Sequence, residues 1–410
     1  MGHLRKVASR QKPARQRVSR TLDPLTEFLR DEAAGGVVLL LATAAALVWA
    51  NGPGGETYGS FWDRELTVGL GQLAITEDLQ HWVNDGLMAL FFFVVGLEIK
   101  RELAVGELRE RRAAVLPVLA ALGGVIVPAA IFLILTAGGD EVDGWAIPMA
   151  TDIAFAVGVL ALLGDRIPSG VKLFLLTIAI VDDLLAISAI ALFYSEGLSL
   201  TWLAAALVGL LAVLGSRRLG VTRVLAYVPL GIFVWAAMHE SGVHATLAGV
   251  ALGLLTPAAP VAGRRVLEEL EHRLHPVTSF GVVPLFALAN AGVALSAAAL
   301  SGAAASGLAW AIALGLVVGK LVGVAGGTLI GLRLGVGTLP QGTQTRHVWG
   351  VAALSGIGFT VSLFITGLAY SEPGMIDTAK VGIFAGSLVS GMLGTVLLMR
   401  ASAGQARRVS

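Results

Sequence analysis

Apolar residues occur along this chain in long runs that are separated by short polar connections. The first run covers residues 35–50, and a helix of about 20 apolar residues is long enough to cross a bilayer. Further runs follow at about 80–99, 113–136, 145–163, 170–194, 200–215, 221–238, 243–256, 279–297, 307–330, 347–370 and 379–399. The pattern predicts an all-α integral membrane protein with about twelve transmembrane helices.

The charges of the connections give an independent indication of the topology. Lys and Arg gather in alternate connections, whereas the connections between them hold mainly acidic residues or no charge. The basic connections contain Lys100, Arg101, Arg109, Arg111 and Arg112; Arg166 and Lys172; Arg217, Arg218 and Arg223; Arg264, Arg265 and Arg273; Arg333 and Arg346; and Arg400, Arg407 and Arg408. Because basic loops remain cytoplasmic, both termini are expected in the cytoplasm, with an even number of spans in the cell (inner) membrane.

The same pattern divides the chain into three parts. Residues 1–34 are expected to form a basic cytoplasmic tail. No A-x-A-like cleavage site follows the first apolar run, which favours a retained span over a cleaved signal peptide. Residues 35–399 form the predicted transmembrane domain, and residues 400–410 a cytoplasmic tail. The longest external loop, 51–79, is rich in Gly and Thr and could carry a small hairpin.

Composition supports a membrane protein and excludes some chemistry. Of the 410 residues 56% are hydrophobic and only 14% are charged, against about 25% in soluble domains. The 52 glycines would let membrane helices approach closely or break. There is no cysteine, so disulfides and thiolate metal sites are excluded.

Four ionisable residues lie inside apolar runs: Asp152, Asp182, Asp183 and Lys320. A carboxylate at the bilayer centre costs about 2.5–3.5 kcal/mol, and its usual role is in an ion or proton pathway. Adjacent helix positions point about 100° apart, so Asp182 and Asp183 face different directions, which suits unequal roles. A purely structural salt bridge with Lys320 is the alternative for either aspartate.

Two spans carry signals of a break in mid-membrane. Pro148 precedes Asp152 by one turn, and Gly356 and Gly358 interrupt the run 347–370. Tight helix packing is the simpler interpretation of the glycines alone. However, each interruption falls in the middle span of a three-span half, 113–194 or 307–400. Matching interruptions of this kind are typical of transporters built from inverted repeats.

The polar groups of these spans suit a hard cation, which prefers oxygen ligands. Asp152, Asp182, Asp183 and Thr151 supply such oxygens. The histidines are interpreted as interfacial or capping residues rather than metal ligands: His239 and His244 at a helix end, and His272 and His275 in a cytoplasmic segment. No cofactor is expected.

At these residues the sequence resembles the NhaA family of sodium/proton antiporters. The matching stretches are GLEIKREL at 96–103, GWAIPMATDIAFA at 144–156, AIVDDL at 179–184, SGVHATLAG at 241–249, PLFALANAGV at 284–293 and GIGFT at 356–360. They follow one another from about residue 80 to 370, and Lys320 stands in the expected place.

The resemblance implies twelve spans, with two crossed, interrupted helices at 145–163 and 347–370. It implies a sodium and proton site at Asp182 and Asp183 with Thr151 nearby, and compensation of the broken helix ends by Asp152 and Lys320. The family's pH-response region is matched by Glu98, Arg101, Glu102, Glu271 and His272. The chain departs from the family pattern at Glu268 and Glu269, where a basic pair would be expected, so the activating pH does not follow from the resemblance.

The function expected is pH-regulated, electrogenic export of sodium, and of lithium, in exchange for protons by alternating access. The protein would be a transporter and not an enzyme. Its partners would be these ions, the lipid bilayer and a second copy bound through the 51–79 loop, with no nucleic acid. Two alternatives remain at this point: a sodium-coupled solute symporter, and an intramembrane aspartyl protease using Asp152 with Asp183, against which the accompanying Lys320 argues.

Overall fold

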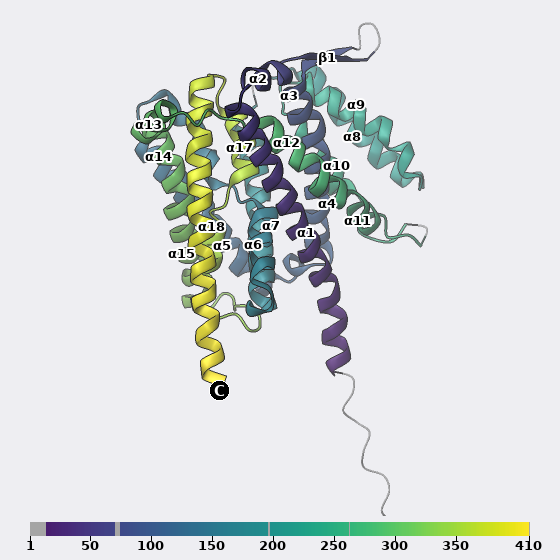
Figure 1. The fold of residues 1–410 in the computed structure, drawn as a ribbon. Coiled ribbons are helices and arrows are strands. Elements are labelled where there is room, and N and C mark those ends of the chain that lie inside the picture. The colour runs from purple at the N-terminus through teal and green to yellow at the C-terminus, as the bar shows by residue number, and fades with distance from the viewer. Residues whose placement is uncertain (1–13, 70–73, 196, 262, 410) are drawn as a thin grey trace, which may run out of the picture.

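The computed structural model describes residues 14–69, 74–195, 197–261 and 263–409, and helices make up nearly all of them (Figure 1). The first half contains α1 (Ala14–Asn51), α2 (Glu56–Trp62), β1 (Glu65–Val68), β2 (Ile75–Asp78), α3 (Leu79–His81), the π-helical turn η2 (Trp82–Leu87), α4 (Met88–Ala104), η3 (Glu107–Arg109), α5 (Arg111–Leu135), the 3₁₀ helix η4 (Asp140–Met149), α6 (Ile153–Leu163), η5 (Gly164–Arg166) and α7 (Ser169–Phe193). The second half contains α8 (Leu200–Arg218), η6 (Val224–Ala226), α9 (Val228–His239), α10 (Thr246–Leu255), α11 (Val266–Val277), η7 (Thr278–Val282), α12 (Val283–Asn290), α13 (Ala297–Ala305), α14 (Gly307–Leu314), η8 (Gly315–Gly319), α15 (Lys320–Arg333), α16 (Thr345–Leu354), α17 (Phe359–Ala369) and α18 (Pro373–Val409).

The protein is an all-helical, multi-pass membrane protein. Within the described residues, 8 helices are long and apolar enough to cross a membrane, and up to 9 when α16 and α17 count as one bent span. The predicted run 243–256 holds α10, of only 10 residues, which at 1.5 Å per residue covers about half of a bilayer core. The run 279–297 holds α12, which continues α11 and η7 without a break as one helical stretch over 266–290. The structure therefore has fewer long spans than the twelve apolar runs predict.

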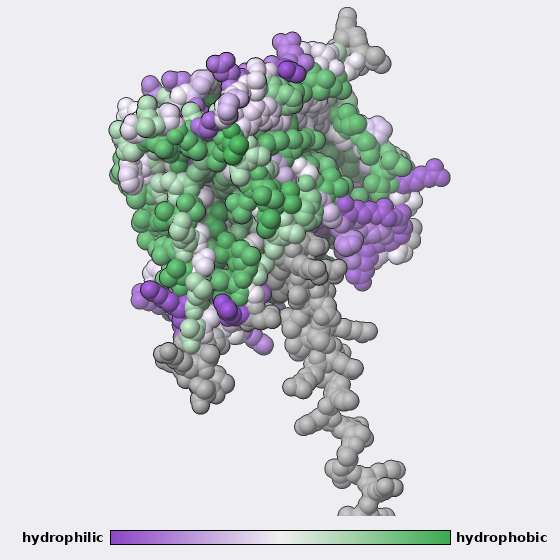
Figure 2. Space-filling view, viewed as in Figure 1, coloured by the Kyte–Doolittle hydropathy of each residue, from purple (hydrophilic) through white to green (hydrophobic). Residues whose placement is uncertain are grey.

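The surface agrees with this assignment. Figure 2 shows hydrophobic residues across the middle of the visible face and hydrophilic residues at its upper and lower ends. Figure 1 shows the first turns of α1 and the end of α18 on the same side of the molecule, opposite the β-hairpin. Residues 1–13 of the predicted tail lie outside the described residues, and α1 begins at Ala14.

Two membrane helices are interrupted. Residues 150–152 have no helical conformation and separate η4 from α6. Pro148 lies inside η4, where it lacks the amide that a regular helix would use. In the other interrupted helix, Ser355–Gly-Ile-Gly358 separates α16 from α17, whose axes differ by 46°. Both interruptions coincide with the proline and glycine signals of the sequence.

Glycine allows the helix that carries Lys320 to lie directly against α5. A Cβ atom on Gly123 would come within 2.1 Å of the Gly323 carbonyl oxygen, so only glycine permits this contact. The π-helical turn η8 ends immediately before Lys320. Such turns shift the helix face that follows them, and they occur often at functional sites. Close packing and the π turn together set the direction of the lysine.

The loop 51–79 carries the hairpin that its composition allowed. Strands β1 and β2 are antiparallel, with Glu65 opposite Asp78 and Val68 opposite Ile75. Trp82 Nε1 donates a hydrogen bond to the Leu66 carbonyl oxygen (2.8 Å) and ties the hairpin to the helix that follows it. Residues 70–73, between the strands, lie outside the described residues.

Candidate functional site

The two interrupted helices touch each other at their breaks. The Asp152 amide donates to the Ile357 carbonyl oxygen (2.6 Å), and Thr151 Oγ1 donates to the Ser355 carbonyl oxygen (2.8 Å). Residues about 200 positions apart in sequence are therefore in direct contact within the membrane-spanning region. The contact brings four helix ends together: the ends of η4 and α16 and the starts of α6 and α17. Each has backbone groups that lack partners within its own helix.

Asp152 satisfies two of these helix ends. Its Oδ1 accepts from the Phe155 amide (3.0 Å), which caps α6. Its Oδ2 accepts from the amide of Thr360 (3.0 Å) and from Thr360 Oγ1 (2.6 Å), at the start of α17. A carboxylate at a helix N-terminus also opposes the positive end of the helix dipole. One buried aspartate thus stabilises the N-terminal ends of α6 and α17, the halves that follow the two breaks.

Lys320 lies on the other side of the breaks and is completely buried. Its Nζ contacts Asp182 Oδ2 at 2.6 Å and donates to Thr151 Oγ1 at 3.1 Å. Because Thr151 in turn donates to Ser355 at the end of α16, the lysine charge faces both a carboxylate and the negative end of a helix dipole. The salt bridge considered from sequence is present for Asp182.

Asp183 faces a different direction from Asp182, as the helical geometry predicts. It lines a small cavity of about 50 Å³ together with Glu98, Asp152 and His275. Within the described part of the chain, Asp182 Oδ1 and Asp183 Oδ1 are buried oxygens that accept no hydrogen bond. Acceptor-only oxygens of this kind suit a hard cation or a proton. The chemistry of the pair therefore fits a monovalent cation exchanged against protons.

Comparison with known proteins gives the same answer. The sequence model of the family "Na+/H+ antiporter 1" matches residues 26–398. The chain belongs to the NhaA family of sodium/proton antiporters. It is 48% identical to the Na(+)/H(+) antiporter NhaA of Mesorhizobium japonicum, covering 94% of this chain and 97% of the relative. It is 44% identical to NhaA 3 of Frankia alni (96% and 93% covered) and 46% identical to NhaA 2 of Erythrobacter litoralis (92% and 93% covered).

Membership of the NhaA family makes this chain a transporter and not an enzyme, which removes the protease alternative. The geometry agrees, because both Asp152 oxygens accept hydrogen bonds from the helix ends. A proteolytic pair needs two carboxylates that both face a substrate. The symporter alternative is removed by the family as well, since the matching relatives are named as antiporters.

The residues that match the family's pH-response region lie mainly where α4 meets α11. Arg101 Nη1 pairs with Glu271 Oε1, and Arg101 Nη2 lies 3.4 Å from Glu102 Oε1. Burial raises the pKa of Glu271, whereas the charge of Arg101 lowers it. Glu98 lines the cavity below Asp183, and His272 is exposed. His275, one turn further along α11, lines the cavity with Glu98.

The two acidic residues that depart from the family pattern each pair with a neighbouring arginine. Glu269 Oε2 contacts Arg264 Nη2, and Glu268 Oε1 lies 3.0 Å from Arg265 Nη1. All four side chains are at least one-third exposed, so these pairs contribute little to stability. They do place compensating positive charge beside the two glutamates.

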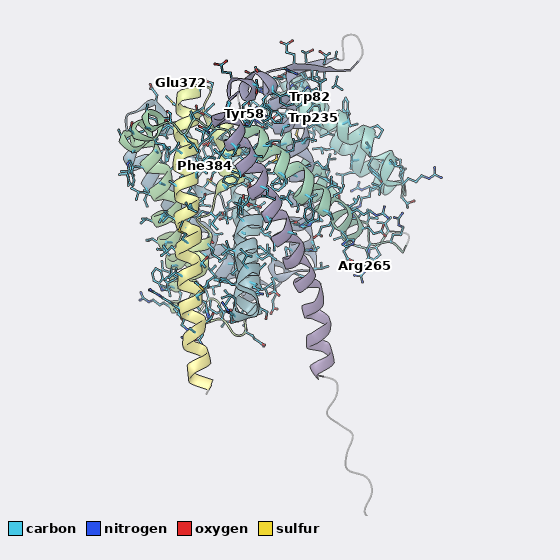
Figure 3. The ribbon with its side chains drawn as sticks, in the orientation of Figure 1. Tyr58, Trp82, Trp235, Arg265, Glu372 and Phe384 are labelled. Atoms are coloured by element: carbon cyan, nitrogen blue, oxygen red, sulfur yellow. The ribbon has the colours of Figure 1, made fainter. Side chains whose placement is uncertain are left out.

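The other histidines have local partners. His239 lies 3.6 Å from Glu77 and 3.8 Å from Asp85, and it stacks on Trp235 (5.8 Å between centroids). Figure 3 labels Trp235 and Trp82, which stack on each other near the end of the molecule that carries the hairpin. His244 Nε2 lies 2.5 Å from the Tyr194 carbonyl oxygen. These contacts connect helices and the hairpin.

Sequence reasoning gave Thr360 no role, although it stands in the matching stretch GIGFT. In the structure its amide and hydroxyl both bind Asp152. A signal was present: a hydroxyl residue in the first turn after a glycine break is suited to bind a group that approaches the helix end. Its partner, 208 residues away, could not be identified without the fold.

Proposed function

We propose that this chain exports sodium, and also lithium, across the inner cell membrane in exchange for protons, with Asp182, Asp183 and Thr151 as the ion-binding site. The observation that carries the proposal is the asymmetry of the pair. Asp182 is paired with a buried lysine, whereas Asp183 lines a cavity, and each aspartate has an oxygen that accepts no hydrogen bond within the described residues. Asp152 and Lys320 compensate the helix ends that surround this site.

Exchange follows from competition for the same oxygens. A sodium ion requires ionised carboxylates, and protonation of those carboxylates removes its ligands. If the cavity opens to one side of the membrane at a time, either sodium or protons must occupy the site before it can face the other side. The two aspartates titrate as one coupled cluster that also contains Lys320.

The exchange is proposed to be electrogenic, with more than one proton moved for each sodium ion. Asp183 and the Asp182–Lys320 pair together offer more than one site for a proton. Net charge then crosses the membrane, and the potential contributes about 2.3 kcal/mol per charge per 100 mV. Sodium export is driven in this way by an inward proton gradient.

Regulation by pH is proposed for the cytoplasmic groups Glu98, Arg101, Glu102, Glu271 and His272. Four of them lie on α4 or in the α4–α11 contact, and one of the four, Glu98, lines the same cavity as Asp183. A change of charge there would alter the electric potential at the entrance to the ion site.

The proposed architecture has twelve spans, with inverted repeats at about 113–194 and 307–400. Corresponding breaks at 150–152 and 355–358 support this reading. The short helix α10 would then be a partial crossing completed by its neighbours. Both termini are proposed to be cytoplasmic, in line with the basic connections and with the common side of the two chain ends (Figure 1). A homodimer through the 51–79 hairpin is proposed as well.

The central test is exchange by Asp183→Asn in everted membrane vesicles. Adding sodium to vesicles with an acidic interior should release protons from wild type and give no sodium-dependent flux in the variant, because Asn cannot ionise. Asp377→Asn, which alters an exposed aspartate at the start of α18, is the matched control and should keep wild-type flux. Undiminished flux in a folded Asp183→Asn protein would contradict the site.

A further inference from the structure

Helix α18 lies along both halves of the second interrupted helix. Gly350 and Leu354 of α16 pack directly against Leu398 and Gly394 of α18, with no space for a Cβ on either glycine. On the α17 side, the rings of Phe359 and Phe384 stack with centroids 5.4 Å apart. Figure 3 labels Phe384 on this helix, below Glu372 and nearer the upper end of the view. The uninterrupted α18 thus supports a helix that is broken beside it.

The start of α17 needs partners for its free amides. A helix leaves its first four N–H groups without partners in the helix, and a membrane interior offers no water to replace them. Asp152 accepts the Thr360 amide. The Gly358 and Phe359 amides instead donate to Ser387 Oγ of α18, at 3.2 and 3.3 Å. Ser387 is buried, with 8% of its surface exposed.

We propose that Ser387 is a positioning residue for the exchange reaction, because its hydroxyl fixes the end of α17 that faces Asp152 and the ion site. It acts through the helix end and touches neither the two aspartates of the site nor Lys320. The inference rests on the exchange mechanism proposed above and adds a residue from α18, a helix to which the sequence analysis gave no part in the site.

Ser387 affects ion binding because it and Asp152 accept different amides at the breaks. Ser387 accepts two amides of α17 without adding charge, and Asp152 accepts the amides of Thr360 and Phe155. Without the hydroxyl, two buried N–H groups would add uncompensated positive potential near the crossing point. Positive potential opposes sodium and proton binding alike, because both carry the same charge.

The experiment compares Ser387→Ala with Ser390→Ala in purified protein reconstituted in liposomes. Ser390 lies one turn further along α18, where its hydroxyl faces the Leu316 carbonyl oxygen at 3.5 Å and binds no amide of α17 in the described structure. Ser387→Ala should raise the KM for sodium by about fivefold or more, with kcat within about twofold of wild type, and should displace the pH profile toward acid. Ser390→Ala should keep the wild-type KM and pH profile.

Two further variants complete the test. Ser387→Thr retains the hydroxyl and should restore the KM and pH profile, whereas Ser387→Cys, a weaker acceptor of similar size, should give an intermediate change. If Ser387→Ala does not fold, the KM for sodium and the pH profile of Ser387→Cys decide the test instead. Wild-type KM and pH profile in the Ala and Cys variants would overturn the inference, as would an equal change in Ser390→Ala. Either result would leave the Asp183 test of the proposed function unaffected.

Discussion

Lys320 is tolerated inside the membrane because every strong contact of its ammonium group is with an acceptor. The charge lies between Asp182 and Thr151, and Gly124 gives its methylene chain room beside α5. A buried pair of this kind stabilises little compared with an apolar pair, yet removing one partner leaves an unpaired buried charge. The pair therefore makes the site dependent on both residues.

Lys320→Ala is expected to lower the free energy of unfolding by about 3–5 kcal/mol, since Asp182 would lose its partner. The measurement is the melting temperature in detergent, by size-exclusion chromatography after heating, together with the pH profile of exchange. Lys380→Ala is the control, because its ammonium group contacts the Gly292 carbonyl oxygen and the half-exposed Asp377 near the start of α18. Equal melting temperatures for wild type and Lys320→Ala would refute the pairing role.

Individual charges were predictable from sequence, but their uncharged partners were not. Asp152, Asp182, Asp183 and Lys320 are conspicuous because each interrupts an apolar run. Thr360 and Ser387 are ordinary residues for a membrane helix, and only the crossing of the two interrupted helices gives them a function. Their partners lie 208 and 28–29 residues away, beyond what helical periodicity can relate.

At the scale of elements, the contact between α4 and α11 links the membrane region to the surface. Arg101 belongs to α4, and Glu271 belongs to α11, which lies outside the candidate spans. Burial of Glu271 raises its pKa above the ordinary value of 4.5, so the folded protein binds a proton there more strongly than the unfolded chain does. The stability that Glu271 contributes is complete below pH 4.5 and is lost as the pH rises through the raised pKa.

Glu271→Gln should therefore remove one pH-dependent part of the stability. The melting temperature of wild type relative to this variant should fall as the pH rises above 4.5 and then become constant above the raised pKa. Melting curves at intervals between pH 4 and 8 would measure the difference. Glu268→Gln changes a half-exposed residue of the same helix and should preserve the wild-type trend. A constant difference between wild type and Glu271→Gln would contradict the argument.

The type of each element was easier to predict than its length or regularity. Apolar runs identified nearly every membrane helix, because hydropathy is the dominant signal in lipid. The same runs could not show that 140–149 is a 3₁₀ helix or that α10 has only 10 residues. Such irregular segments depend on partners elsewhere, as when Tyr194 and Tyr370 hydroxyls bind carbonyl oxygens of Asp143 and Glu141 in η4.

At the scale of the whole molecule, charge and hydropathy agree on one orientation. The apolar belt of Figure 2 separates two hydrophilic ends, and basic connections occur on alternate sides along the sequence. In Figure 3 the exposed Glu372 lies at the upper end of the visible face, and the exposed Arg265 lies lower, at its right-hand edge. The proposed topology places Glu372 outside the cell and Arg265 in the cytoplasm.

The absence of cysteine from the sequence makes this orientation directly measurable, because any introduced thiol is the only one present. Glu372→Cys should react with a membrane-impermeant maleimide in intact cells or spheroplasts, and Arg265→Cys should react only in everted vesicles, since a charged reagent does not cross the bilayer. Both variants should keep exchange activity, because neither residue lies near the aspartate pair. Labelling of both from the same side would exclude the proposed topology.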